Sequence, residues 1–205
     1  MNSGTGYSWK DITLADGPCS GPSYYTDLQI QANANSTDPA IVVQLNTLTV
    51  GKCGRVIILG NGPIDLRIGA PTAQSFTMLG KSSGNAQDHF GVTSADTQAS
   101  VVLVPVAQLT VSVLSDGTGT KQATTCTLTT TCAVYLQHVY HSGTFLSPNG
   151  GAQLDDNEGL SQGAFIAKQF AIDNMSTLHS DTSGLTGGGG GGGTNFSTLR
   201  SWKDQ

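Results

Sequence analysis

Short apolar runs separated by turns rich in glycine and proline follow one another through the first 140 residues. Residues 40–50 and 55–59 are rich in β-branched side chains, and residues 64–68 alternate between apolar and polar side chains. Such runs predict strands, and the Gly60–Pro63 turn predicts that 55–59 and 64–68 form a hairpin. Further strands are expected at 75–79, 101–104, 107–113 and 123–140. We therefore expect a mainly β fold, a β-sandwich or jelly-roll-like barrel with an N-terminal arm, over residues 1–150.

The hydrophobic pattern changes its period after residue 150. Apolar side chains recur every three to four residues from Leu160 to Leu178, which predicts one C-terminal helix. The preceding segment, Leu154–Glu158, offers N-cap residues and acids that favour the start of a helix. We expect residues 151–186 to form this helix and a loop, packed on the β domain or on a neighbouring molecule.

The last part of the chain, residues 187–205, has the pattern of a tether and a docking tail. Seven consecutive glycines, Gly187–Gly193, predict a flexible tether of roughly 25 Å at full stretch. The tetrapeptide Ser8–Asp11 recurs as Ser201–Asp204, and the two copies hold both tryptophans of the chain. Aromatic side chains are favoured anchors in protein interfaces, although coincidence also explains the repeat. The residues predicted as assembly contacts are Trp9, Phe196, Leu199 and Trp202.

Charge is scarce in this chain of 205 residues. Charged residues make up 11% of it, and the net charge is −5 with nine lysines and arginines in total. Binding to nucleic acid or to an anionic membrane needs clustered basic residues, so we expect neither partner. Residues 122–154 contain no charged side chain at all, which suits a face covered by identical neighbours.

The N-terminal residues have neither a basic nor an apolar segment typical of a signal peptide. We therefore expect a protein that is made and used without Sec export, or one whose signal has been removed. Four cysteines stand at positions 19, 53, 126 and 132. Buried free thiols are favoured, and disulfides across strands are the alternative. Cys126 and Cys132 would lie roughly 20 Å apart on one straight strand, too far to bond.

Motifs that carry chemistry are weak. Gly80–Gly84 fits a nucleophile elbow, but no helical pattern follows it. His138 and His141 would point to opposite sides of a strand, and His89 and His179 have no visible partner. Asp155–Gly159 resembles the start of a calcium loop, yet Ile166 stands where the twelfth-position acid is needed. We expect no catalytic residues, no metal and no cofactor.

These patterns favour a structural protein of a large assembly rather than an enzyme. The leading hypothesis is a virion component, such as a phage capsid decoration or cement protein, with copies of itself and a major capsid or scaffold protein as partners. Its place would be the virion, assembled in the host cytoplasm, or alternatively the extracellular space. The alternative function is a carbohydrate-binding or extracellular fibre module, and the third is a hydrolase.

Overall fold

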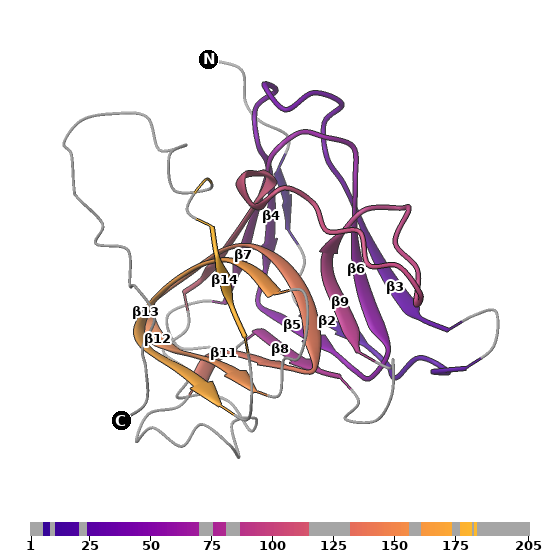
Figure 1. Ribbon diagram of the computed structural model, residues 1–205. Coiled ribbons are helices and arrows are strands. Elements are labelled where there is room, and N and C mark those ends of the chain that lie inside the picture. Colours follow the sequence, from indigo (N-terminus) through magenta and orange to yellow (C-terminus); the bar gives the residue numbers. More distant parts are fainter. Residues whose placement is uncertain are drawn as a thin grey trace.

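Figure 1 shows the computed structural model of the chain. It describes residues 6–8, 11–20, 24–69, 76–80, 87–114, 132–155, 161–173, 177–181 and 183. Fourteen strands join in one sheet within these residues. The first seven are β1 (Gly6–Ser8), β2 (Asp11–Leu14), β3 (Thr26–Gln31), β4 (Ile41–Leu45), β5 (Thr47–Val50), β6 (Gly54–Leu59) and β7 (Ile64–Ile68). The others are β8 (Phe76–Leu79), β9 (Asp88–Val92), β10 (Leu109–Val113), β11 (Cys132–Gln137), β12 (Val139–Asp155), β13 (Ser161–Asp173) and β14 (His179–Ser180), with the short 3-10 helix η1 (Val106–Gln108) before β10.

Every strand pair in this part of the chain is parallel. The pairs divide into three faces. The first face contains β1, β4, β7 and β10, and the second contains β2, β5, β8 and β11. The third face contains β3, β6 and β9, which lie beside one another in Figure 1.

The two long strands β12 and β13 continue all three faces in turn. β12 pairs with β9 at its start, with β10 in its middle and with β11 at its end. β13 follows β12 along almost its whole length, and β14 pairs with the start of β13. The chain therefore winds repeatedly around one axis, and each coil lies on the previous one. This arrangement is a three-faced parallel β-helix.

The expectation of a mainly β fold is confirmed, but a sandwich or jelly roll, which is built from antiparallel strands, is wrong. The predicted hairpin of residues 55–59 and 64–68 shows why. β6 lies on the third face and pairs with β3 and β9, whereas β7 lies on the first face and pairs with β4 and β10. The Gly60–Pro63 turn is thus a corner between coils and not a hairpin loop.

The predicted C-terminal helix is also wrong, because residues 161–173 form β13 and no α-helix occurs among the described residues. Gly163 stands at the corner between the third and first faces, opposite Gly143. Both have positive φ, +152° and +141°, and a Cβ atom on Gly163 would clash with the Gly143 carbonyl oxygen. At the next corner of β13, between the first and second faces, the following inward side chain comes three residues later instead of two. A strand that contains such a corner therefore shows apolar spacings like those of a helix. The described residues hold no helix long and apolar enough to cross a membrane.

Columns of apolar side chains fill the interior, one residue from each coil. On the first face the column runs through Val43, Leu66, Val111, Phe145 and Phe165. On the second face, one column runs from Ile12 to Phe170 and the next from Leu14 to Ile172. Most members are fully buried, and rings from neighbouring coils pack together, as Phe145 and Phe165 do at 4.5 Å between centroids. These stacked columns form the core that holds the coils together.

Candidate functional site

A row of polar and aromatic residues crosses the outside of the third face. Asp27 of β3, Arg55 of β6, His89 of β9 and Tyr140 of β12 occupy the same register position on successive strands. Their neighbours in sequence, Leu28, Val56, Phe90 and His141, point inward because side chains alternate along a strand. The fold thus gathers four side chains that are far apart in sequence.

Arg55 is the centre of this cluster. Its Nε and Nη2 donate to the two carboxylate oxygens of Asp27 at 2.9 and 2.8 Å. Its Nη1 donates to the backbone oxygen of Asp96 at 2.7 Å and lies 3.4 Å from the Asp96 carboxylate. The guanidinium also lies over the ring of Tyr25, 4.7 Å from the centroid. Hydrogen bonds to Asp27 are the main cause that raises the pKa of Arg55.

His89 and Asp96 form the buried part of the cluster. The Nδ1 of His89 lies 2.7 Å from Asp96 Oδ2, and both side chains are almost fully buried. The other carboxylate oxygen of Asp96 accepts the backbone N–H of Val102 at 3.0 Å. In the tautomer whose Nδ1 donates to the carboxylate, Nε2 accepts a hydrogen bond from the Tyr25 hydroxyl, 3.1 Å away. The order Asp96, His89, Tyr25 is that of a carboxylate–imidazole–hydroxyl relay.

The surroundings of Tyr25 oppose a catalytic use of this relay. Burial, and next the negative charge of Asp96, raise the pKa of the Tyr25 hydroxyl far above its ordinary value. A nucleophilic or basic tyrosine needs the opposite shift. One face of the ring is also covered by Arg55. The cluster therefore acts as a clasp that ties the segment from Asp96 to Val102 onto β6 and β9.

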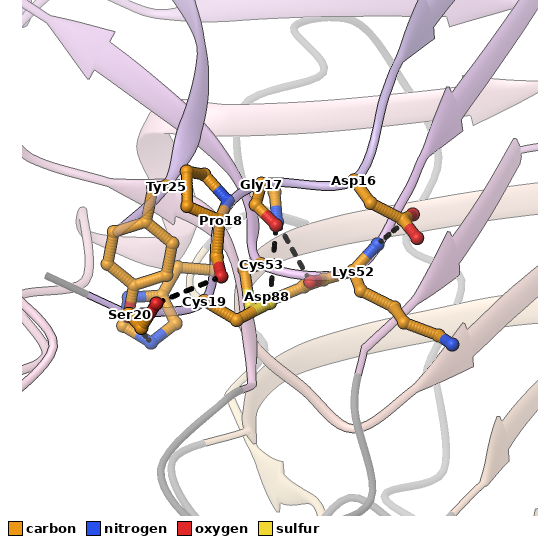
Figure 2. Close-up of a disulfide and its surroundings, with 11 residues drawn as sticks. Asp16, Gly17, Pro18, Cys19, Ser20, Tyr25, Lys52, Cys53 and Asp88 are labelled. Atoms are coloured by element: carbon orange, nitrogen blue, oxygen red, sulfur yellow. Dashed lines mark hydrogen bonds between the residues drawn. A yellow bond between two sulfur atoms is a disulfide. The ribbon is translucent and has the colours of Figure 1, made fainter. Parts of the chain in front are cut away.

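A disulfide joins the first two coils at the corner between the second and third faces (Figure 2). Cys19 and Cys53 both have a φ of +54°, and their Cα atoms lie 5.5 Å apart. His138 takes the same left-handed conformation at the corresponding corner between β11 and β12, with a φ of +51°. Stacking of equivalent corners brings the two cysteines within bonding distance. Cys132 is disulfide-bonded as well, so the preference for free thiols is wrong at these three positions.

A buried carboxyl group lies beside this disulfide. Asp88, fully buried at the start of β9, accepts the backbone N–H of Gly54 at 3.0 Å through Oδ1. Its Oδ2 has no hydrogen-bond partner among the described residues. Burial raises the pKa of Asp88 to about 8. At neutral pH this side chain is therefore mostly protonated, which is the form that a dry environment favours.

A second buried titratable group lies inside the coil stack. His141 points into the interior and lies beside the stacked rings of Phe145 and Phe165, 5.4 and 5.5 Å away between centroids. Within the described structure neither of its ring nitrogens has a hydrogen-bond partner. Burial lowers its pKa to about 3, so the imidazole is neutral at physiological pH. His141 thus serves as a core side chain, packed edge-on against aromatic rings.

The two ends of the coil stack differ from its interior. In the described part of the chain the exposed large apolar side chains are Phe170, 37% exposed, and Ile172, 50% exposed. Both belong to the last coil, where the two inner columns of the second face end. Among the described residues, this part of β13 pairs with β12 on one side and with no strand on the other. The described residues therefore leave an apolar strand edge without a pairing strand at this end.

The residues predicted as assembly contacts, Trp9, Phe196, Leu199 and Trp202, lie outside the described residues, as do the glycine tether and residues 81–84 of the elbow motif. The sequence predicts His138 and His141 on opposite sides of one strand, but they do not share a strand: His138 lies at the corner between β11 and β12, and His141 is buried in β12. Asp155 ends β12 and accepts the Tyr135 hydroxyl at 2.6 Å, so it does not begin a helix. No group of three or more His, Cys, Asp or Glu in the described part is placed to hold a metal ion.

The sequence alone missed the clasp completely. Its row members stand at positions 27, 55, 89 and 140, so the steps between them are 28, 34 and 51 residues. Because these steps are unequal, a search for a sequence repeat does not reveal that the four residues lie side by side on successive strands. A better signal was available for the disulfide, since Cys19 and Cys53 are 34 residues apart, the same step as from Arg55 to His89. Comparison of the chain with protein-family models, with curated proteins and with solved structures gives no match.

Proposed function

We propose that this protein is a non-catalytic structural component of a large assembly, such as a virion or a surface fibre. The observation that carries the proposal is the apolar end of the coil stack, which no strand among the described residues pairs with and where Phe170 and Ile172 are exposed. Proteins seldom leave a strand edge and large apolar side chains open to water unless another molecule covers them. Copies of this chain and a capsid or scaffold protein are the partners that this role implies.

The disulfide bears on where such an assembly would work. Disulfides persist in oxidising surroundings, which include the extracellular space and the surfaces of virions and cells, and are rare in the cytosol. The Cys19–Cys53 bond therefore supports an assembly that is exposed to the medium. A phage capsid decoration protein on a mature particle is one form of it, and a fibre subunit on a cell surface is the other.

The clasp on the third face supports a structural role over the two alternatives. A hydrolase needs an activated hydroxyl or a free base, whereas the Tyr25 hydroxyl has a raised pKa and bonds to His89. A sugar-binding platform needs free aromatic faces. The ring of Tyr25 packs against Arg55 on one side and against the rings of Tyr24 and His89 at 4.8 and 4.9 Å.

Immunogold electron microscopy of the source culture tests the proposal. Antibodies raised against the purified chain should label regular particles or fibres, and the labelled fraction should sediment with them. An antibody raised against an unrelated protein of similar charge is the control. Label that stays entirely in the soluble fraction after particles have been removed would refute an assembly role.

A further inference from the structure

The two ends of the coil stack match each other on the second face. At the last coil, Phe170 and Ile172 end two neighbouring inner columns. At the first coil, Ile12 and Leu14 of β2 begin the same two columns and are only partly buried. Each column therefore starts and finishes with an apolar side chain that lacks a neighbour on its outer side among the described residues.

The backbone edges match as well. Among the described strands, β2 pairs only with β5, and the second-face part of β13 pairs only with β12. β2 and β13 run in the same direction, because all the strand pairs that lie between them on the second face are parallel. The N–H and C=O groups on the free edge of β13 thus face the same way as those that β2 offers to β5. A further parallel strand fits there without a change in direction.

We propose that this end binds the first coil of a second copy of the same chain. The proposal rests on the assembly function proposed above and names its partner. In such a contact Ile12 of one copy would lie on Phe170 of the next, and Leu14 on Ile172, so that both columns continue across the junction. The interface is head-to-tail, with different surfaces from the two copies. A head-to-tail contact of this kind leaves both outer ends free and extends into a line of molecules.

The size of the contact sets its strength. A face of the coil is four to six residues wide, which is roughly 15–20 Å. The end of the stack therefore buries only a few hundred Å² on each copy, below the roughly 800 Å² per partner of a standard stable interface. We expect a weak equilibrium in dilute solution that becomes strong where many copies are held close together.

Sedimentation velocity of the full chain between about 10 and 500 µM tests the contact. The weight-average mass should rise steadily with concentration and pass beyond that of a dimer. Ile172→Lys, at an exposed position, should leave the fold intact by circular dichroism and weaken association at least tenfold, because it places a charge in the junction. The matched control is Gln44→Lys, which adds the same charge at an exposed position on the first face and should associate like the wild type.

Mixing distinguishes a head-to-tail contact from any symmetric one. Ile172→Lys blocks only one end, so a variant molecule can still bind through its first coil and stop a growing line. Adding it to wild type should shorten the wild-type oligomers, whereas Gln44→Lys should not. A wild-type chain that stays monomeric at 500 µM would overturn the proposal, and another part of the chain, such as residues 194–205, would then be the cover. Oligomers that ignore Ile172→Lys would overturn it too.

The same variant separates this inference from the assembly function. If labelled particles incorporate Ile172→Lys as well as they incorporate wild type, the chain is an assembly component whose contacts lie elsewhere. If no particle carries the chain, the function itself fails. Loss of incorporation with Ile172→Lys, but not with Gln44→Lys, supports both.

Discussion

Removing the Cys19–Cys53 disulfide should cost the protein several kcal/mol of stability. The bond closes a loop whose ends are 34 residues apart. For a loop of about 35 residues, the loss of chain entropy in the unfolded state is roughly 13 cal/mol/K, or about 3.8 kcal/mol at 25 °C. Cys53 is fully buried, so Cys19→Ala/Cys53→Ala also removes one packed sulfur atom. The expected loss in the free energy of unfolding is therefore about 4 kcal/mol.

Urea denaturation without reductant, followed by circular dichroism, measures this loss. Each single variant should lose nearly as much as the double variant, because either change opens the same loop. The melting temperature should fall by roughly 8–15 °C for a chain of this size. Single losses that add up to the double loss, or a double loss below about 1 kcal/mol at unchanged denaturant slope, would refute the reasoning from chain entropy.

Three further predictions concern the other buried groups. Asp88→Asn should stabilise the protein by up to about 4 kcal/mol at pH 7. With a folded pKa of about 8 for Asp88, the wild type loses stability as the pH rises from about 4 to 8, whereas the variant does not. An equal gain in stability at pH 4 and at pH 7 in urea titrations would contradict this. His141→Phe should have the opposite pH dependence. With a folded pKa of about 3 for His141, the wild type loses stability as the pH falls from 6.5 to 3. The free energy of unfolding of the variant minus that of the wild type should therefore be roughly 3 kcal/mol larger at pH 4 than at pH 7. The same difference at both pH values would count against this prediction. Arg55→Ala should lower the free energy of unfolding by roughly 3 kcal/mol, because it leaves the buried Asp96 carboxylate without its cation. Arg67→Ala, which breaks the exposed pair with Asp65, should lower it by less than about 1 kcal/mol. Equal losses of stability on thermal melting would refute the clasp.

The sequence predicts β4 to β8, β10 and β11 because each strand in a coil buries one side, as it would in a sandwich. It does not predict β1, β2, β3 or β9, and residues 101–104, expected as a strand, form none. The alternation in residues 64–68 and 109–113 is the same in both folds. What differs is the connection. Only Asn46 separates β4 from β5, and only His138 separates β11 from β12. A hairpin loop usually needs at least two residues, so a single residue between strands indicates a corner. Residues 40–50 hide this corner because they read as one continuous strand.

The C-terminal helix fails for a different reason. Residues 164–171 hold three alanines, one lysine and one glutamine, which favour a helix when the chain is considered alone. Pairing with β12 overrides this preference, since twelve residues of β13 find partners there. The inward side chains are Phe165 and Ala167 before a corner, and Phe170 and Ile172 after it. Inward side chains are therefore two residues apart within a face and three residues apart across the corner. Only the register of the neighbouring coil decides between the two patterns.

The stacked corners have a mechanical consequence. Each coil touches only the coils directly before and after it, so a force that pulls on the two ends of the chain should peel coils away one at a time. The Cys19–Cys53 bond ties the first coil to the second at their shared corner. Unravelling from the N-terminal side is therefore blocked by this covalent bond after the first coil. Unravelling from the C-terminal side has to break only the noncovalent contacts of β13. Under tension, the molecule should unravel in one preferred direction.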